Sequence, residues 1–267
     1  MTKASTSTAA GAPAYPQGRN LLQGKTVLIT AAAGTGIGFA AAKRCSEEGA
    51  VVFLSDSHER RLGEAVQKLS SSTQAAPHSR VCDVTKETEV RALVNTAVKT
   101  MGRIDVLVNN AGLGGSASIV DMTDEQWSKV LDVSLTSVFR MTRAVLPHMY
   151  ARRGGAIVNN SSVLGWRAQA LQAHYAAAKA GVMAFTRCAA IEAAEYGVRV
   201  NAVAPSIAMH EFLNRVTTAE VLAELRRGEA FGRTAETWEI ANVIVFLASD
   251  LASYLTGEVI SASSQRA

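Results

Sequence analysis

Short apolar runs alternate with longer, more polar segments through most of this chain. The runs are typical of buried strands and occupy residues 25–30, 51–55, 79–82, 104–109, 155–161, 198–203 and 258–262. Helices are expected between them, including long ones at 124–146 and 173–196. Regular alternation of strand and helix predicts an α/β fold, a doubly wound seven-stranded parallel sheet with helices on both faces.

A glycine-rich turn follows the first predicted strand. Lys25–Thr30 leads into Ala31-Ala-Ala-Gly34-Thr-Gly36-Ile-Gly38, and the helical stretch Phe39–Gly49 comes next. Glycines here let the backbone approach a pyrophosphate at a positively polarised helix N-terminus, because no Cβ blocks the way. Such a turn alone often marks only a tight connection. Asp56, just past the second strand, adds a partner for an adenosine ribose hydroxyl, so the pattern predicts a Rossmann-type dinucleotide site.

Tyr175 and Lys179 lie four residues apart in an alanine-rich helical segment, and Ser162 ends a strand thirteen residues upstream. Side chains at i and i+4 share a helix face, which brings the Lys ammonium beside the phenol. A fixed positive charge favours the phenolate and is expected to lower the pKa of Tyr175 from its ordinary value near ~10. With Ser162 as a hydrogen-bond donor to the same substrate oxygen, the three residues predict proton-transfer machinery. The Tyr–Lys spacing alone also occurs by chance.

From Leu21 to Gly257 the chain resembles the short-chain dehydrogenase/reductase family. Besides the motifs above, Cys82-Asp83-Val84, Asn109-Asn110-Ala111-Gly112 and Asn201-Ala-Val-Ala-Pro205 carry the resemblance. It implies hydride transfer at a carbon bearing oxygen: Tyr175 exchanges the proton, Ser162 orients the oxygen, and Lys179 holds the ribose, without a metal. The residues that we expect at the cofactor are Thr30, Gly34, Thr35, Gly36, Ile37, Gly38, Asp56, Asp83, Val84, Asn110, Ala111, Gly112, Tyr175, Lys179, Pro205 and Ile207.

Four departures from the family pattern narrow the comparison. Three alanines follow Thr30 where Gly is usual, Ser134 replaces a catalytic Asn, and Pro205-Ser206 replaces Pro-Gly, with His210 at a common Thr position. The stretch Thr256–Ser264 replaces the usual Asp-Gly-Gly ending. Together with the segments 56–61 and 164–168, this combination is similar to actinobacterial reductases of steroid-nucleus breakdown, which are often labelled 3-oxoacyl-ACP reductases.

Three functions compete at this point. The first is an NAD(P)-dependent oxidoreductase that interconverts a secondary alcohol and a ketone on the ring of a steroid-derived acid. The second is a 3-oxoacyl-ACP or CoA thioester reductase. The third, kept open by Ser134, is a dinucleotide-sensing module without turnover. The substrate contacts expected are Gly114, Leu164, Trp166, Arg167, Gln169 and His210, although Arg167 and His210 also fit loop-packing roles; residues 207–232 are a candidate lid.

Cofactor choice depends mainly on Asp56. A carboxylate at this position hydrogen-bonds the ribose diol of NAD and repels the extra phosphate of NADP. Thr35 in the glycine turn is neutral and also favours NAD. His58, Arg60 and Arg61 follow closely and leave NADP possible. We therefore expect NAD.

Length and composition set the domain organisation. A chain of 267 residues with 48% hydrophobic content suits one domain, over residues 21–267. Residues 1–20 lack an apolar centre and predict a disordered N-terminal tail, neither a signal peptide nor an anchor. Cys45, Cys82 and Cys188 are scattered, which favours reduced thiols in the cytoplasm over disulfides or a zinc site.

Charge and family resemblance bear on partners. The net charge is +4, but Lys and Arg are spread along the chain, so we expect no nucleic-acid partner. The pairs at 60–61, 152–153 and 226–227 are explained by solvated helix faces or, alternatively, by a substrate carboxylate or coenzyme A phosphate. No apolar stretch approaches the ~20 residues that span a bilayer. The resemblance implies a small-molecule substrate and a homo-oligomer, a dimer or tetramer.

Overall fold

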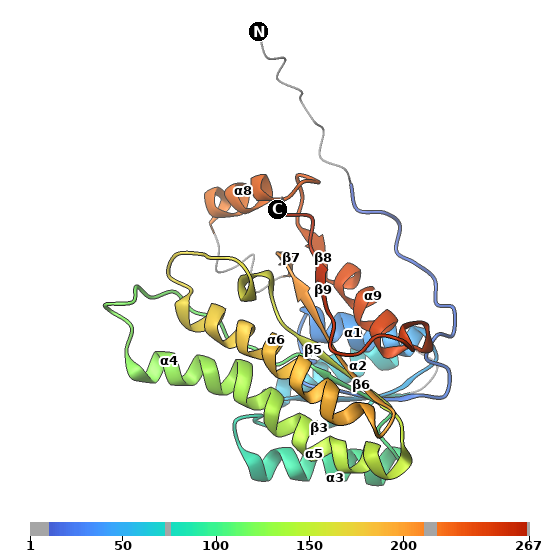
Figure 1. The fold of residues 1–267 in the computed structure, drawn as a ribbon. Coiled ribbons are helices and arrows are strands. Elements are labelled where there is room, and N and C mark those ends of the chain that lie inside the picture. The colour runs from blue at the N-terminus through green and yellow to red at the C-terminus, as the bar shows by residue number, and fades with distance from the viewer. Residues whose placement is uncertain (1–10, 73–75, 211–217, 266–267) are drawn as a thin grey trace.

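Seven parallel strands form one sheet in the order β3-β2-β1-β4-β5-β6-β9 (Figure 1). The computed structural model describes residues 11–72, 76–210 and 218–265. The strands are β1 (Thr26–Ile29), β2 (Val51–Asp56), β3 (His78–Val81), β4 (Val106–Asn109), β5 (Gly155–Asn160), β6 (Val198–Pro205) and β9 (Val259–Ala262). The predicted doubly wound α/β fold is confirmed, and each strand lies within two residues of its predicted bounds.

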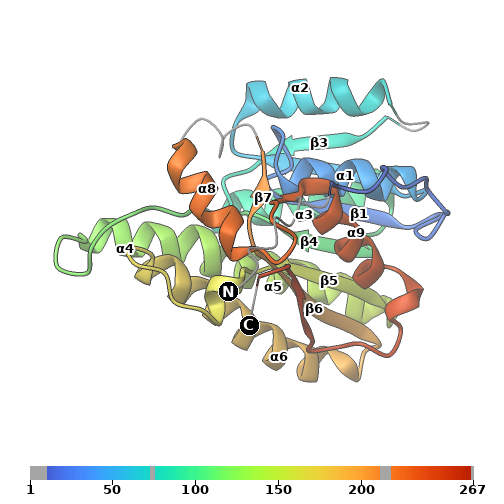
Figure 2. The ribbon, with the colours of Figure 1, turned by 90° about the horizontal axis from the view of Figure 1, so that it is seen from above.

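Helices cover both faces of the sheet (Figures 1 and 2). One core cluster packs α1 (Ile37–Glu47), α2 (Glu59–Ser70) and α9 (Thr237–Ala248) on one face. The other packs α3 (Glu87–Met101), α5 (Ser137–Arg152) and α6 (Ala173–Ala194) on the opposite face. Neighbouring residues of β1 show why both faces are apolar: Val27 and Ile29 belong to the first cluster, whereas Leu28 belongs to the second.

The long helix predicted at 124–146 is interrupted. It divides into α4 (Asp124–Leu131), a π-helical turn (Asp132–Thr136) and α5. Ser134 lies in the middle of that turn and is fully buried. A π-helical turn inserts one extra residue and rotates the side chains around it, often at a functional site. The prediction of one continuous helix was therefore wrong at the position that matters for Ser134.

Two short strands and a helix lie above the carboxyl edge of the main sheet. The strands β7 (Ala208–Met209) and β8 (Ala235–Glu236) pair in parallel, and α8 (Ala219–Gly228) lies between them in sequence. In Figure 1, α8 stands apart from the helices that pack on the sheet, close to the C-terminus. The segment 207–232, predicted as a lid, thus includes a helix, while 211–217 lie outside the described residues.

Residues of the N-terminal segment contact α1 and α9 where the structure describes that segment. The Tyr15 hydroxyl donates to Glu47 at 2.7 Å, and its ring meets Trp238 of α9 edge-on at 5.4 Å between centroids. The Arg19 amide donates to Glu48 at 2.7 Å. These partners on α1 and α9 hold a segment whose composition alone predicts disorder, because one aromatic residue supplies both a polar and an apolar contact. Residues 1–10 lie outside the described part.

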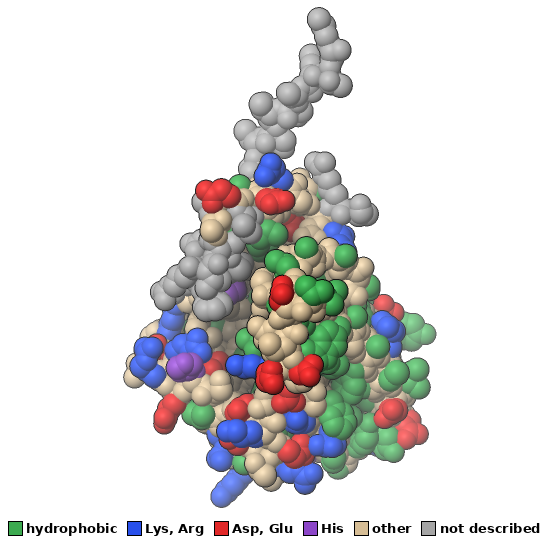
Figure 3. Space-filling view, turned by 90° about the vertical axis from the view of Figure 1, so that its left-hand side faces the viewer, with side chains coloured by type: hydrophobic (Ala, Val, Ile, Leu, Met, Phe, Trp, Pro, Cys, Tyr) green, Lys and Arg blue, Asp and Glu red, His purple; other side chains and the backbone are tan. Residues whose placement is uncertain are grey.

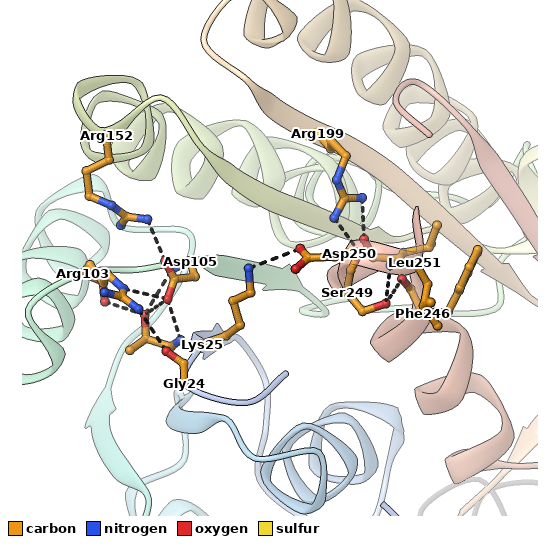
Figure 4. Close-up of polar contacts among 12 residues, drawn as sticks. Gly24, Lys25, Arg103, Asp105, Arg152, Arg199, Phe246, Ser249, Asp250 and Leu251 are labelled. Carbon is orange, nitrogen blue, oxygen red and sulfur yellow. Dashed lines mark hydrogen bonds and ion pairs between the residues drawn. The ribbon is translucent and has the colours of Figure 1, made fainter. Parts of the chain in front are cut away.

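Charged residues form hydrogen bonds and ion pairs at the amino-terminal edge of the sheet, opposite the carboxyl ends of the strands (Figure 4). Asp105 accepts hydrogen bonds from the Thr26 amide at 2.9 Å, Arg103 Nε at 2.9 Å and Arg152 Nη2 at 2.7 Å. Burial alone would raise the pKa of Asp105, but these bonds and the two Arg charges outweigh it and lower the pKa. Nearby, Arg199 donates to two carbonyls at the end of α9.

Figure 3 shows acidic and basic side chains intermixed, with hydrophobic side chains gathered along its right-hand side. That side carries the helices at the front of Figure 1. Exposed hydrophobic residues on α4, α5 and α6 are Trp127, Phe139 and Ile191. Among the described helices, none combines the length and apolar character required to cross a membrane.

Candidate active site

The carboxyl ends of the strands converge on a cavity of about 290 Å³. Parallel strands end at the same sheet edge, so loops that are distant in sequence meet there. Ser162 and Tyr175 both line the cavity, next to residues 205–208 at the end of β6 and just beyond it. Other lining residues come from the loop after β5, from the end of β7, from α8 and from the C-terminal segment: Leu164, Gln169, His210, Leu225 and Gln265.

Ser162 and Tyr175 share the wall of the cavity, and Ser162 is near enough to influence the pKa of the phenol. Ser162 lies two residues beyond β5 and begins a 3-10 turn, where its Oγ accepts from the Leu164 amide at 3.2 Å. Tyr175 lies in the first turn of α6. Burial raises the pKa of Tyr175, while Ser162 opposes that rise without cancelling it. The phenol is therefore held in its protonated form at neutral pH.

Lys179 lies one helical turn further along α6, as its spacing predicts. Its Nζ is 5.5 Å from the centre of the Tyr175 ring and donates to the Asn160 carbonyl at 2.7 Å. Only 2% of the residue is exposed, and burial lowers its pKa to about 8. A Cβ at Gly112 would lie 3.3 Å from Nζ, so glycine leaves room for the ammonium. The expected lowering of the Tyr175 pKa by this charge is not observed: burial raises the pKa of the phenol, and the one influence that opposes the rise comes from Ser162.

Ser134 holds the loop after β4. Its Oγ accepts from the Leu113 amide at 2.9 Å and donates to the Leu113 carbonyl at 3.0 Å. One buried hydroxyl thus satisfies both backbone groups of a residue that immediately follows Gly112 beside Lys179. In this structure Ser134 positions the loop and does not itself contact Tyr175 or Lys179 through a hydrogen bond among the described residues.

A polar network joins three strand ends beneath the cavity. Thr30 Oγ1 accepts from the amides of Asn110 and Ala111 at 3.0 and 3.1 Å. Asn110 Nδ2 donates to the Ala31 carbonyl at 3.0 Å, and Asn160 Nδ2 donates to Asn110 Oδ1 at 2.9 Å. Since the Asn160 carbonyl also accepts from Lys179, the network links the glycine turn to Lys179, one of the predicted proton-transfer residues. Sequence reasoning did not identify Asn160 as a residue of the site, although its position at the end of a predicted strand could have indicated this role.

The glycine turn fits a dinucleotide pyrophosphate. Apart from their own chain neighbours, the described residues place no atom within 4 Å of the Cβ positions of Gly34 and Gly36, and Gly34 has φ +83°. The backbone is therefore open at the N-terminus of α1, where no side chain caps the helix. Gly38 packs closely, since a Cβ there would lie 2.3 Å from the Ala31 carbonyl oxygen. Ala31 itself has φ +50°, a left-handed conformation that glycine adopts without strain.

Acidic residues end the neighbouring strands. Asp56, at the end of β2, accepts from the Ala33 amide at 3.3 Å and from the His58 amide at 2.9 Å. Asp83, after β3, accepts from the amide and hydroxyl of Thr85 at 3.0 and 2.7 Å. Both carboxylates thus lie at the same edge as the glycine turn. Arg60 pairs with Glu64 on its own helix at 2.6 Å.

The predicted substrate residues separate into two groups. Leu164, Gln169 and His210 line the cavity, and burial lowers the pKa of His210. Gly114 lies near Tyr175, whereas Trp166 and Arg167 are not among the lining residues. Leu225 lies within the segment 207–232 that was expected to line the pocket, whereas sequence reasoning missed Gln265, which carries no motif. Within 11–72, 76–210 and 218–265, no three His, Cys, Asp or Glu residues are grouped as metal ligands.

Comparison with known proteins gives one family match and close full-length relatives. A family model described as enoyl-(acyl carrier protein) reductase matches residues 31–264. A reductase of Mycobacterium tuberculosis, named for (5R,7aS)-5-hydroxy-7a-methyl-1-oxo-2,3,5,6,7,7a-hexahydro-1H-indene-carboxyl-CoA, is 62% identical over 95% of this chain and 97% of its own length. The 3-oxoacyl-[acyl-carrier-protein] reductase FabG of Thermotoga maritima is 41% identical over 90% and 96%.

A solved structure agrees with these matches. The crystal structure of a short chain dehydrogenase from Mycobacterium smegmatis superposes with a TM-score of 0.86 at 56% identity. It covers 96% of this chain and 99% of that one. Both the fold and the sequence are therefore shared along nearly the whole length.

Proposed function

The chain belongs to the short-chain dehydrogenase/reductase family, whose members use NAD or NADP, and from this premise we propose that it is an NAD-dependent reductase of a bicyclic ring ketone. The substrate class is a hydroxylated or oxidised methyl-indene carried as a coenzyme A thioester, as expected for a fragment of the steroid nucleus. The enzyme interconverts the ring ketone and the corresponding secondary alcohol.

One observation carries this proposal. The relative from M. tuberculosis, named for such a thioester, is 62% identical across nearly the full length of both chains. The cavity is consistent with the assignment, since Leu164, Ile207 and Leu225 offer apolar surface beside Ser162 and Tyr175. A bicyclic hydrocarbon with one reacting oxygen requires such a combination of apolar walls and a few placed donors.

The proton-transfer step follows from the residues themselves. An ordinary phenol is already protonated at neutral pH and burial raises the pKa of Tyr175 further, so its hydroxyl carries a proton that passes to the substrate oxygen as the carbonyl is reduced. Ser162 orients this oxygen by a second hydrogen bond. Lys179, with a pKa of about 8, is a second proton donor next to the phenol. Its ammonium group is held in place by the Asn160 carbonyl. Nicotinamide dinucleotide, when bound, supplies the hydride.

The dinucleotide would be held by the open backbone at Gly34 and Gly36, with Asp56 and Asp83 toward its adenosine end. Asp56 carries the choice of NAD, because its carboxylate would repel a ribose phosphate. The pairing of Arg60 with Glu64 supports this choice, since Arg60 already has an anionic partner on α2. Self-association as a dimer or tetramer and a cytoplasmic location remain predictions; exposed Trp127 and Phe139 support the first.

Turnover assays test the proposal. Purified protein is incubated with NADH or NADPH and the methyl-indene thioester, and absorbance of the reduced cofactor and product mass are followed. We expect turnover with NADH and a product that has gained a pair of hydrogens, and its loss in Tyr175→Phe with NADH binding retained. An unchanged rate in Tyr175→Phe would reject Tyr175 as the acid. No turnover by the wild type, with cofactor bound, would favour the sensing module instead.

The second candidate is a 3-oxoacyl thioester reductase, which the 41% identity to FabG of T. maritima favours. Acetoacetyl-CoA separates it from the first. Efficient turnover of acetoacetyl-CoA with none of the methyl-indene thioester would establish this second function. Preference for NADPH over NADH would in addition transfer the cofactor role from Asp56 to Arg61 or His58.

A further inference from the structure

The last described residues, Ser263–Gln265, form a strap between the sheet and α8. They follow β9, and the Ser264 carbonyl accepts from the Ala230 amide at 2.6 Å. The Ser264 hydroxyl donates to Glu229 at 2.6 Å, and Glu229 pairs with Gln265 as an antiparallel bridge. Glu229 is only 3% exposed. The strap is therefore built into the structure at the point where α8 ends.

The side chain of Gln265 is oriented by a charged neighbour. Its Oε1 accepts from Arg167 Nη1 at 2.8 Å. A guanidinium group only donates hydrogen bonds, so the carbonyl side of the amide must face Arg167 and the Nε2 side must face away. Gln265 also lines the cavity that contains Ser162 and Tyr175. The Nε2 hydrogens are thus the polar groups that Gln265 offers to a molecule in this cavity.

Gln265 enters the cavity from a different direction than the proton-transfer residues. Ser162 and Tyr175 come from the end of β5 and the start of α6, whereas Gln265 follows β9 and contacts the end of α8. A rigid substrate whose reacting oxygen lies at Tyr175 therefore meets Gln265 with another part of its surface. Gln265 also directly follows the stretch 256–264, in which this chain departs from the family's usual ending.

We propose that Gln265 is a specificity-determining residue whose Nε2 donates a hydrogen bond to a second ring oxygen of the substrate. This inference rests on the proposed function and names the feature that the site selects: a bicyclic ring with two oxygens, one reacting at Tyr175 and one held by Gln265. Arg167 acts through Gln265 as a positioning residue. A site that hydrogen-bonds a substrate oxygen discriminates strongly against analogues that lack it.

The test uses Gln265→Glu, which keeps an oxygen for Arg167 but removes the Nε2 donors, and Gln265→Met, which is neutral and of similar length. Steady-state kinetics and calorimetric binding in the presence of cofactor are measured with the methyl-indene thioester and with acetoacetyl-CoA. We expect KM and Kd for the ring thioester to rise about 10- to 100-fold in both variants, with kcat nearly unchanged. For acetoacetyl-CoA, which has no ring oxygen, kcat/KM changes less than about 3-fold.

Ser264→Ala is the matched control, because it removes the bond to Glu229 and leaves the Gln265 amide in place. If the strap only stabilises the fold, this variant and the Gln265 variants lose both substrates equally, and the proposal is overturned. Unchanged KM and Kd for the ring thioester in Gln265→Glu also overturn it. Failure of the proposed function gives a different result. The wild type would then bind the ring thioester without turning it over, and the change in Kd between wild type and the Gln265 variants would still show whether Gln265 holds the ring.

Discussion

Replacing Lys179 by Met is expected to stabilise the protein while removing activity. A lysine with an ordinary pKa of 10.5 has a pKa of about 8 at this position, because burial penalises its charge. This difference in pKa between the unfolded and folded chain corresponds to a destabilisation of roughly 3 kcal/mol, at about 1.4 kcal/mol per pH unit. The bond from Nζ to the Asn160 carbonyl returns about 1 kcal/mol in the wild type. Met has a similar length and no charge, so the variant should gain about 2 kcal/mol in free energy of unfolding at pH 7.

The pH dependence of the stability difference tests whether the buried charge of Lys179 is its cause. Between about pH 8 and 10.5 the unfolded chain binds a proton at Lys179 that the folded chain has released, so wild-type stability rises with pH in this window. The advantage of Lys179→Met is therefore full below about pH 8 and declines as the pH rises toward 10.5. Other groups titrate equally in both proteins and cancel in the difference.

Urea unfolding at fixed protein concentration, at several pH values from 6 to 10, measures this difference. Lys99→Met is the matched control, because Lys99 is an exposed residue of α3 and its replacement should change stability by less than about 0.5 kcal/mol at any pH. A Lys179→Met protein that is less stable than the wild type at pH 7 would refute the reasoning. So would an advantage that is the same at pH 7 and pH 10.

Three further perturbations test the loops around the site. Ala31→Gly relieves the positive φ and should be about 1–2 kcal/mol more stable in urea than Ala33→Gly, which loses the same methyl group where φ is not positive; equal stability would contradict this. Ser134→Ala leaves both backbone groups of Leu113 unpaired and should cost about 1–3 kcal/mol in the free energy of unfolding and lower kcat/KM, whereas an unchanged unfolding midpoint would mean that the loop finds other partners. Asp105→Asn should lower the free energy of unfolding by about 1–3 kcal/mol at pH 7. Because the pKa of Asp105 is lowered in the folded protein, the difference from the wild type should vanish as the pH falls through that pKa. A difference that persists in acid would show that the charge of Asp105 is not the cause.

Local patterns in the sequence were sufficient for the fold and for the proximity of the proposed proton-transfer residues on α6. Buried strands read as apolar runs because both faces of a parallel sheet are covered, as the division of Val27 and Leu28 between the two cores shows. Tyr175 and Lys179 meet because helical geometry relates residues four apart. The glycine turn was visible because its backbone requirement limits the residue types.

Properties that depend on burial and on long-range contacts emerged from the folded structure. The pKa of Tyr175 rises because the phenol is enclosed, a property of its surroundings and not of its spacing from Lys179. Gln265 reaches Arg167 across 98 residues and joins the cavity, although no motif marks it. Periodicity and turn chemistry act over a few residues and are legible in the sequence; the environment of a side chain is assembled from distant segments and exists only once the chain has folded.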